Sequence, residues 1–315
     1  MQKVTVGEND AGQRLDKFLA KLMPKLPKSM LYKGIRKNCV KLGTKHIKDG
    51  SYKLCEGDIL SLYFGDEFFE KPAYLSDFIK VSPKLDIVYE DENLLLVNKP
   101  QGLLAHEDNK QNPENLLSHI KSYLYKKGEY TPVAENTFAP ALANRIDRGT
   151  GGIVIAAKNA QSLRILNEKI KNREIKKFYL CLAYGHFEEK EGKICGYLLR
   201  DENTRKVTFF NEPVFGAKMT VTKYRVLDEF PDYSLIETEL ETGRTHQIRA
   251  GFAHIGHPLL GDRKYAAPEI NRKFPFTSQA LYAYKLKFEF TTNSGILGYL
   301  NGKSFEIKDL EFTKK

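Results

Sequence analysis

The first part of the chain carries apolar residues at a helical spacing, followed by short segments that alternate as strands do. Within GQRLDKFLAKLMPKL the spacing i, i+3, i+4 and i+7 predicts a helix with one buried face, formed by Leu15, Phe18, Leu19 and Leu22. Pro24 and Pro27 end this helix, and Ser29 is placed to cap a second short helix in MLYKGIRK. Residues 40–64 read as short strands joined by glycine turns.

Strands dominate from residue 86 onward. The segments that predict them are DIVYEDENLLLVNKP, residues 153–157, KKFYLCLAYGHF, AKMTVTKYRVLDEF, YSLIETELETG and ALYAYKLKFEF. Helical periods occur in NPENLLSHIKSYLYKKG and SLRILNEKIKN, whereas residues 66–85, directly after Gly65, mix proline and charge without a clear period, as a linker does. The sequence therefore predicts an α+β fold: a small α+β module at 1–65, and a domain at 86–315 with a mixed, largely antiparallel β-sheet and flanking helices.

The charge distribution separates the same two regions. Residues 1–64 contain 13 Lys and Arg against 6 Asp and Glu, whereas the remaining residues contain 37 against 34. A basic module on a nearly balanced body of a 315-residue chain favours a polyanionic partner, because each phosphate contact releases counterions. Solubility alone is the competing explanation for the charge.

The cysteines and the apolar runs bear on location. The four cysteines are scattered, with no CxxC, which is typical of reduced thiols in a cytoplasmic protein. The longest apolar runs are far shorter than the roughly 20 residues of a membrane helix, and MQKVTVGEND is unlike a signal peptide. We therefore expect a cytoplasmic protein with no membrane partner.

One carboxylate stands out by its surroundings. Asp147 lies between Arg145 and Arg148 and is followed by Gly-Thr-Gly-Gly and then by the apolar run 153–157. A solvated surface ion pair is the ordinary explanation for such a triplet. A glycine-rich turn, however, lets the backbone approach a ligand closely, and a buried strand would hold it. A carboxylate kept ionised by a nearby arginine can act as nucleophile or base, so Asp147 is the candidate reactive group.

A second cluster occupies ELETGRTHQIRAGFAHIGHPLLGDRKY. His246, His254 and His257, with Asp262 as a fourth ligand, would suit a metal site and a metal-dependent hydrolase. His257 precedes Pro258, however, and so lies past the end of any helix, and no HExxH motif is present. Histidines hydrogen-bonded around a turn are the favoured interpretation, and we expect neither a metal nor a cofactor.

The basic module resembles the S4 RNA-binding domain. The matching segments are RLDKFLA, then S…I-R-K-N-x-V-K-L-G, then EGDIL. In S4 domains a helix pair presents a basic face to RNA, and the resemblance assigns that face here to Arg14, Lys17, Ser29, Lys33, Arg36 and Lys37. The usual Ser-Arg pair is Ser29-Met30 in this chain, so one expected cation is missing.

The larger domain resembles the RluA family of pseudouridine synthases. The matching segments, in the family's order, are LLLVNKPQGLLAH, NRIDRGTGGIVIAAKN, KKFYLCLAYG, GRTHQIRAGFAHIGHPLLGDRKY and QALYAYKLKF. The second is usually HRLDRDTSG, so Asn144 replaces His, and Gly149 and Gly151 replace Asp and Ser. Gly251 stands where the family usually has His. We expect these departures to change hydrogen bonds around the site and, with them, the identity of the substrate.

The resemblance implies the pseudouridine synthase fold and an isomerase that converts uridine in RNA to pseudouridine without cofactor or metal. It makes Asp147 the essential aspartate, which attacks the sugar or removes a ribose proton. It makes Tyr179 the active-site tyrosine, which stacks on the flipped uracil and helps to remove the C5 proton. We expect Arg249 to pair with Asp147, with Arg244 as the alternative. By resemblance Arg145 fills the space left by the flipped base, and Arg148 contacts phosphate or pairs with an acid.

The partner implied is RNA, and the S4 module favours large-subunit (23S) ribosomal RNA over transfer RNA. A monomer is expected. A catalytically silent RNA-binding or ribosome-assembly protein on the same fold is the main alternative. The presence of Asp147, Tyr179 and Arg249 together argues against that alternative.

Overall fold

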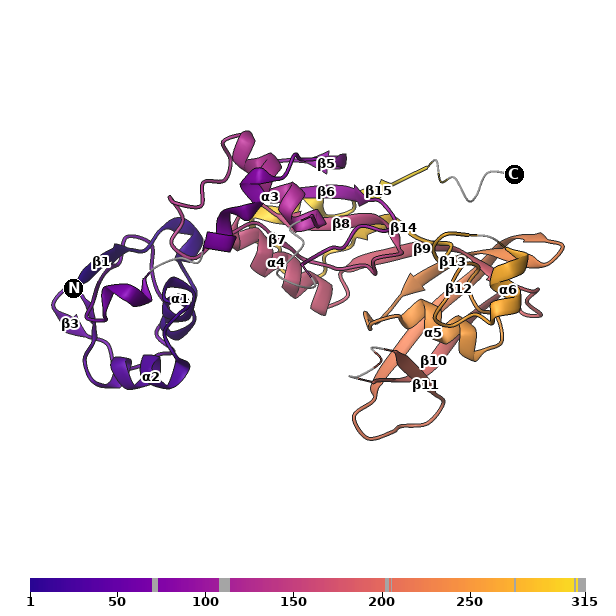
Figure 1. Cartoon of the computed structure of the whole chain (residues 1–315), viewed down its shortest axis with the longest axis horizontal. Coiled ribbons are helices and arrows are strands. Elements are labelled where there is room, and N and C mark those ends of the chain that lie inside the picture. Colours follow the sequence, from indigo (N-terminus) through magenta and orange to yellow (C-terminus); the bar gives the residue numbers. More distant parts are fainter. Residues whose placement is uncertain are drawn as a thin grey trace. The chain divides into compact units, whose positions relative to one another are not determined.

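A computed structural model describes residues 1–69, 73–107, 114–201, 204, 206–274, 276–308 and 310, with the backbone alone for 73–76 (Figure 1). The chain divides into two compact units. The first consists of Met1–Pro83, Leu117–Ala141 and Lys158–Gln161, and the second of Lys84–Leu116, Leu142–Ala157 and Ser162–Lys315. No helix among the described residues is both long enough and apolar enough to cross a bilayer.

A helix pair and a small sheet begin the first unit. The elements are β1 (Gln2–Thr5), η1 (Glu8–Asp10), α1 (Leu15–Leu22), α2 (Lys28–Arg36), β2 (Val40–Leu42), β3 (Lys45–His46) and β4 (Ile59–Leu62). The strands form an antiparallel sheet in the order β1-β4-β2-β3. Apolar side chains of α1, α2, β2 and β4 share one core, so the predicted apolar face of α1 is buried as expected.

The start of α2 differs from the sequence prediction. The helix begins at Lys28, with Pro27 at the N-cap, and Ser29 lies in its first turn without capping it. The expectation that Ser29 caps this helix is therefore wrong. Proline has φ fixed near −65° and no N–H to leave unsatisfied, so Pro27, expected only to end the preceding helix, also begins this one.

The segment expected to be a linker contains two short 3-10 helices, η2 (Asp66–Phe68) and η3 (Ala73–Lys80), and residues 70–72 lie outside the described part. The helix α3 (Leu116–Lys126) also belongs to the first unit from its second residue onward.

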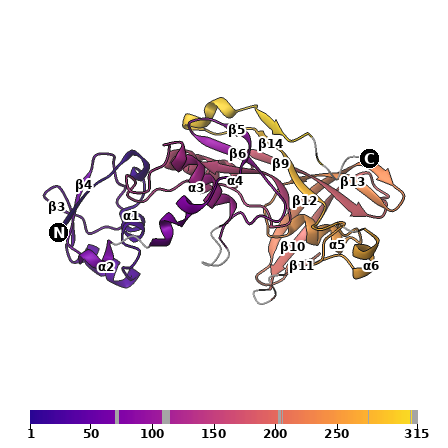
Figure 2. The same ribbon diagram turned by 45° about the horizontal axis from the view of Figure 1, so that its top comes forward.

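A single long sheet organises the second unit (Figure 1, Figure 2). Its strands are β5 (Asp86–Glu90), β6 (Leu94–Lys99), β7 (Ala141–Leu142), β8 (Gly151–Ala157), β9 (Ile175–Tyr184), β10 (Glu191–Arg200), β11 (Val207–Phe210), β12 (Lys218–Phe230), β13 (Tyr233–Leu240), β14 (Leu281–Phe288) and β15 (Ser304–Glu306). They follow the order β11-β10-β12-β13-β9-β14-β8-β6-β5, with β15 on β14 and β7 on β8. The helices are α4 (Ala160–Lys171), α5 (Gln247–His254), α6 (Pro268–Lys273) and the 3-10 helix η4 (Gly295–Leu300).

Two sets of helices flank this sheet. Leu166 of α4 and two leucines of η4 share a core with apolar residues of β6, β8 and β14, whereas α5 packs against β10, β11 and β12. The expected α+β class, with a mixed and largely antiparallel sheet, is confirmed.

The only parallel pairing among the described strands joins β8 to β14, with Gly151 opposite Tyr282 and Gly152 opposite Ala283. Gly152 has φ +117°, and a Cβ there would lie 2.2 Å from the carbonyl oxygen of Ala283. Only glycine permits so close an approach. The turn that precedes β8 is thereby fixed against β14.

Candidate active site

Asp147 lies on the turn between β7 and β8, where its main-chain carbonyl accepts a hydrogen bond from Thr150 N at 3.0 Å. The glycines that follow pack against residues 279–283: Gly149 faces the side chain of Gln279, and Gly151 faces the ring of Tyr282. The expectation that these glycines make room for a ligand is therefore wrong. They let the turn approach its neighbouring strand, which positions Asp147.

A fully buried lysine at the end of β6 supports the same turn. Lys99 Nζ donates hydrogen bonds to the carbonyls of Pro100 at 3.0 Å, Leu103 at 2.8 Å and Arg148 at 3.1 Å. Burial lowers the pKa of Lys99 to about 8, against the opposing charge of Asp147, so the ammonium keeps its three donors at neutral pH. Sequence reasoning quoted this lysine within its motif but gave it no role.

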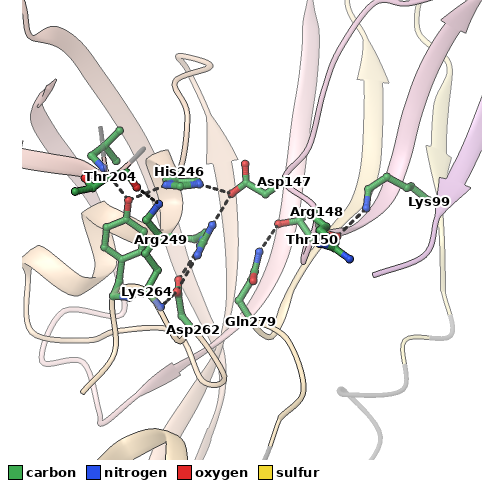
Figure 3. Close-up of polar contacts among 12 residues, drawn as sticks. Lys99, Asp147, Arg148, Thr150, Thr204, His246, Arg249, Asp262, Lys264 and Gln279 are labelled. Atoms are coloured by element: carbon green, nitrogen blue, oxygen red, sulfur yellow. Dashed lines mark hydrogen bonds and ion pairs between the residues drawn. The ribbon is translucent and has the colours of Figure 1, made fainter. Parts of the chain in front are cut away.

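The charge partner of Asp147 is Arg249 of α5, and Figure 3 shows the contact between the two side chains. Arg249 Nη1 donates to Asp147 Oδ2 at 2.9 Å, while Nε and Nη2 donate to the two oxygens of Asp262 at 2.7 and 2.9 Å. The side chain of Asp262 is 0% exposed. Burial disfavours the charged guanidinium, but the hydrogen bonds and charge of Asp262, with Asp147, raise the pKa of Arg249 above its ordinary value. A buried, bidentate partner therefore holds Arg249 charged and oriented toward Asp147.

Gln247 fixes the start of α5. Its Oε1 accepts hydrogen bonds from Thr242 Oγ1 and Arg244 N, and its Nε2 donates to Val221 O and Thr222 Oγ1. Arg244 itself is exposed, and its Nε donates to Met219 O at 3.2 Å. Of the two arginines considered for Asp147, Arg249 makes the contact.

His246 is a second neighbour of Asp147. It occupies the N-cap of α5 with φ +54°, and its Nε2 lies 3.7 Å from Asp147 Oδ2. Its Nδ1 lies 2.8 Å from the hydroxyl of Tyr265. His246 was weighed as a metal ligand, but the favoured interpretation, a histidine hydrogen-bonded at a turn, is confirmed. Tyr265 lies in the same sequence motif but was given no role there.

Asp147, His246 and Arg249 line a cleft of about 1120 Å³. The side chain of Asp147 is 27% exposed, and within the described part of the chain its Oδ1 has no hydrogen-bond partner. Tyr179, on β9, lines the cleft and is largely buried; burial, together with the charge of Asp147, raises the pKa of its phenol. The cleft thus brings an oriented carboxylate together with a neutral aromatic ring.

The two arginines beside Asp147 lie at the rim. Arg145 is exposed and lines the cleft. Arg148 also lines it, and its Nε donates to the carbonyl of Gly102 at 2.9 Å. Arg148 thus joins its turn to the loop after β6. Phosphate or an acid was expected as its partner, and the partner found in this structure is a main-chain carbonyl.

The other histidines of the cluster have separate partners. His254 stacks on Phe209, and His257 lies past the end of α5, as expected, and stacks on Phe187. Asp262, the fourth ligand of the metal hypothesis, instead accepts hydrogen bonds from Arg249. No group of three metal-ligating side chains occurs among the described residues.

Two of the positions that depart from the family pattern have defined contacts. Asn144 Oδ1 accepts a hydrogen bond from Ile155 N at 2.7 Å, which ties its turn to β8. The space beside Gly149 is taken by Gln279, whose Nε2 donates to Thr150 Oγ1 at 3.1 Å.

The residues predicted to face RNA in the first unit lie on and beside its helix pair. The side chains of five are exposed: Lys17, Ser29, Lys33, Arg36 and Lys37. Arg14 is about half exposed and forms an ion pair of 2.7 Å with the nearly buried Asp16. Its hydrogen bond with Asp16 raises the pKa of Arg14. The other five side chains of this set form no ion pair with an acid in the described part of the chain.

Comparison with known proteins places this chain in a family. Residues 93–254 match the family described as RNA pseudouridylate synthase, and residues 13–60 match the S4 domain. An uncharacterised RNA pseudouridine synthase of Mycoplasma capricolum is 33% identical over 306 residues, which cover 96% of each chain. The ribosomal large subunit pseudouridine synthase C of Vibrio parahaemolyticus is 31% identical over 305 residues, covering 93% of this chain and 90% of the relative.

A solved structure has the same fold. Human RNA pseudouridylate synthase domain containing 1 superposes with a TM-score of 0.53 at 22% identity, covering 71% of this chain and 83% of the human one. The expected pseudouridine synthase fold is thereby confirmed. The chain therefore belongs to the RNA pseudouridine synthases of the RluA family and carries an N-terminal S4 domain that binds RNA.

Proposed function

We propose that Asp147 is the catalytic residue of this isomerase and that its Oδ1 is the reacting oxygen. Arg249 Nη1 occupies Oδ2 and is itself held by the buried Asp262, which leaves Oδ1 the oxygen available to a nucleotide in the cleft. That geometry is the observation that carries the proposal: one carboxylate oxygen neutralised by a fixed cation, the other open.

The reaction requires an ionised carboxylate with one unshared oxygen. The bond from N1 of uracil to the ribose C1′ breaks, the base turns, and C5 bonds to C1′, while C5 loses its proton and N1 gains one. Substrate and product contain the same atoms, so nothing is consumed. Asp147 either attacks the ribose or removes a ribose proton, and both routes begin from an ionised, unshared carboxylate oxygen.

Tyr179 and Arg145 complete the proposed site. A uridine must leave its stack before Asp147 can reach its sugar, which costs a few kcal/mol. Tyr179, neutral and at the wall of the cleft, stacks on the extruded uracil, and the planar guanidinium of Arg145, at the rim, fills the place the base leaves.

The substrate we propose is large-subunit ribosomal RNA. Two observations support it: the S4 domain, and the similarity over nine tenths of its length to a synthase named for the large ribosomal subunit. In this proposal residues 1–65 anchor the RNA and residues 86–315 perform the chemistry, joined by residues 66–85.

Tritium release tests the substrate directly, because isomerisation frees the hydrogen at C5. With RNAs labelled at uracil C5, we expect release to water from 23S RNA, in about stoichiometric amounts per modified uridine, and background release from 16S RNA and transfer RNA. Release from transfer RNA alone would overturn the assignment of substrate while leaving the enzyme class intact.

The RNA-facing surface of α2 is tested by charge removal. Lys33→Ala with Arg36→Ala removes two exposed cations, so RNA affinity should fall and the slope of log K against log salt should become shallower by about one to two. Lys45→Ala with Lys48→Ala removes the same charge from the exposed hairpin side of the first unit and is the matched control. An equal change in slope for both pairs would mean that general charge, not the helix pair, contacts the RNA.

A further inference from the structure

We propose that His246 is a positioning residue for Asp147, held by the Tyr265 hydroxyl with its Nε2–H directed at the carboxylate. This inference rests on the proposed role of Asp147 as the catalytic residue. It assigns a function to His246 and Tyr265, to which the family resemblance gave no role.

The hydroxyl of Tyr265 decides which nitrogen of His246 carries the proton. It accepts a hydrogen bond from Val207 N at 3.0 Å and lies 2.8 Å from His246 Nδ1. A backbone N–H can only donate, so the phenol hydrogen is available for Nδ1. If Nδ1 were the donor instead, the phenol oxygen would receive two donors, and its own hydrogen would have no acceptor among the described residues. The neutral imidazole therefore carries its hydrogen on Nε2, toward Asp147.

The surroundings favour the neutral imidazole. Burial lowers the pKa of His246, assisted by the nearby cations Arg249 and Lys264 and opposed by Asp147 and Asp262. The exposed fraction of the side chain is only 14%. A neutral N–H donor can orient a carboxylate without neutralising the charge that the reaction uses.

The two donors converge on one oxygen, as Figure 3 shows. Arg249 Nη1 lies 2.9 Å and His246 Nε2 3.7 Å from Asp147 Oδ2. The second distance exceeds that of a hydrogen bond, and catalytic hydrogen bonds commonly shorten when substrate binds. Once the His246 contact shortens to a hydrogen bond, Oδ2 is held from two sides, so the carboxylate cannot turn and Oδ1 stays directed into the cleft.

The backbone at this position provides a discriminating pair of variants. His246 has φ +54°, a left-handed conformation that asparagine adopts more readily than most residues. Asparagine thus suits the backbone and places its amide near the Nδ1 position, away from Asp147. Glutamine suits the backbone less well, but its longer amide can place an N–H near the Nε2 position.

We expect the two variants to rank oppositely in stability and in rate. His246→Asn should unfold at or above the denaturant concentration of His246→Gln, yet its single-turnover rate should fall about 30-fold, against about threefold for His246→Gln. The KM for RNA should stay within about twofold of wild type in both. A rate for His246→Asn equal to or above that of His246→Gln would overturn the proposal, as would a change confined to KM.

The tautomer is measured without any activity. In protein labelled with ¹⁵N-histidine, couplings between ring hydrogens and nitrogens report which nitrogen is protonated, and the His246 signals are those missing from His246→Gln. We expect the Nε2–H form in wild type and a mixture in Tyr265→Phe, whose ring still lies beside Arg249. An Nδ1–H tautomer in wild type would overturn the proposal, even if Asp147 proves essential.

Discussion

Asp147→Asn is expected to lower tritium release from C5-labelled RNA by at least about 10⁴-fold. Asparagine has the shape of aspartate and keeps an oxygen that can accept from Arg249 Nη1, but it cannot supply an ionised oxygen to the ribose. Arg249 retains its bidentate bond to Asp262, so the fold should be preserved. RNA affinity should therefore change little, and the loss should lie in the rate constant of the chemical step.

A surface aspartate gives the matched control for this variant. Asp86 is exposed, accepts a hydrogen bond from Asn98 Nδ2 at 2.7 Å and does not line the cleft. Asp86→Asn therefore makes the same chemical change outside the proposed site. Its tritium release should equal that of wild type. Release by Asp147→Asn at more than about one hundredth of the wild-type rate would remove Asp147 from the reaction.

The parts of the fold that follow from local pattern are those the sequence predicted. The apolar face of α1 and the alternation in β9, β12, β13 and β14 each arise within one segment, and the structure contains them. The strands β1, β7, β10, β11 and β15 were not anticipated. β1 has only four residues and pairs with β4, and β10 contains two glycines and is defined by β11 and β12 on its two sides. Their conformation depends on partners that are remote in sequence.

In the candidate site, too, local sequence patterns predicted some features, and contacts between remote residues determine the others. Asp147 was indicated by its neighbours in the sequence. No local pattern indicated that Asp262 accepts hydrogen bonds from Arg249, or that Lys99 donates to three carbonyls at the turn. The glycines were correctly seen as a close approach, but they approach β14 and Gln279 and not a ligand. A glycine in the sequence indicates that there is no space for a side chain at that position, but it does not indicate which group takes up that space.

Asp262→Ala is expected to lower the free energy of unfolding by about 3–5 kcal/mol, because it removes one partner of a buried ion pair. Asp262 is fully buried and accepts hydrogen bonds from Arg249 Nε and Nη2 and from the backbone N–H of Lys264. Its loss leaves the guanidinium without its bidentate acceptor. Asp232→Ala is the control, since the Asp232–Lys273 pair is exposed and such pairs contribute about 0–1 kcal/mol.

Asp262→Asn separates the charge from the shape. The amide oxygen can still accept from Lys264 N–H, so the loss of stability should be smaller, about 1.5–3 kcal/mol. The rate should nevertheless fall about 100-fold, because Arg249 is no longer fixed by two charge-assisted bonds and can turn toward both oxygens of Asp147. Denaturant unfolding and single-turnover tritium release measure the two effects separately. A stable Asp262→Asn variant with wild-type rate would mean that the buried acid supports only the fold, and that Arg249 orients Asp147 without it.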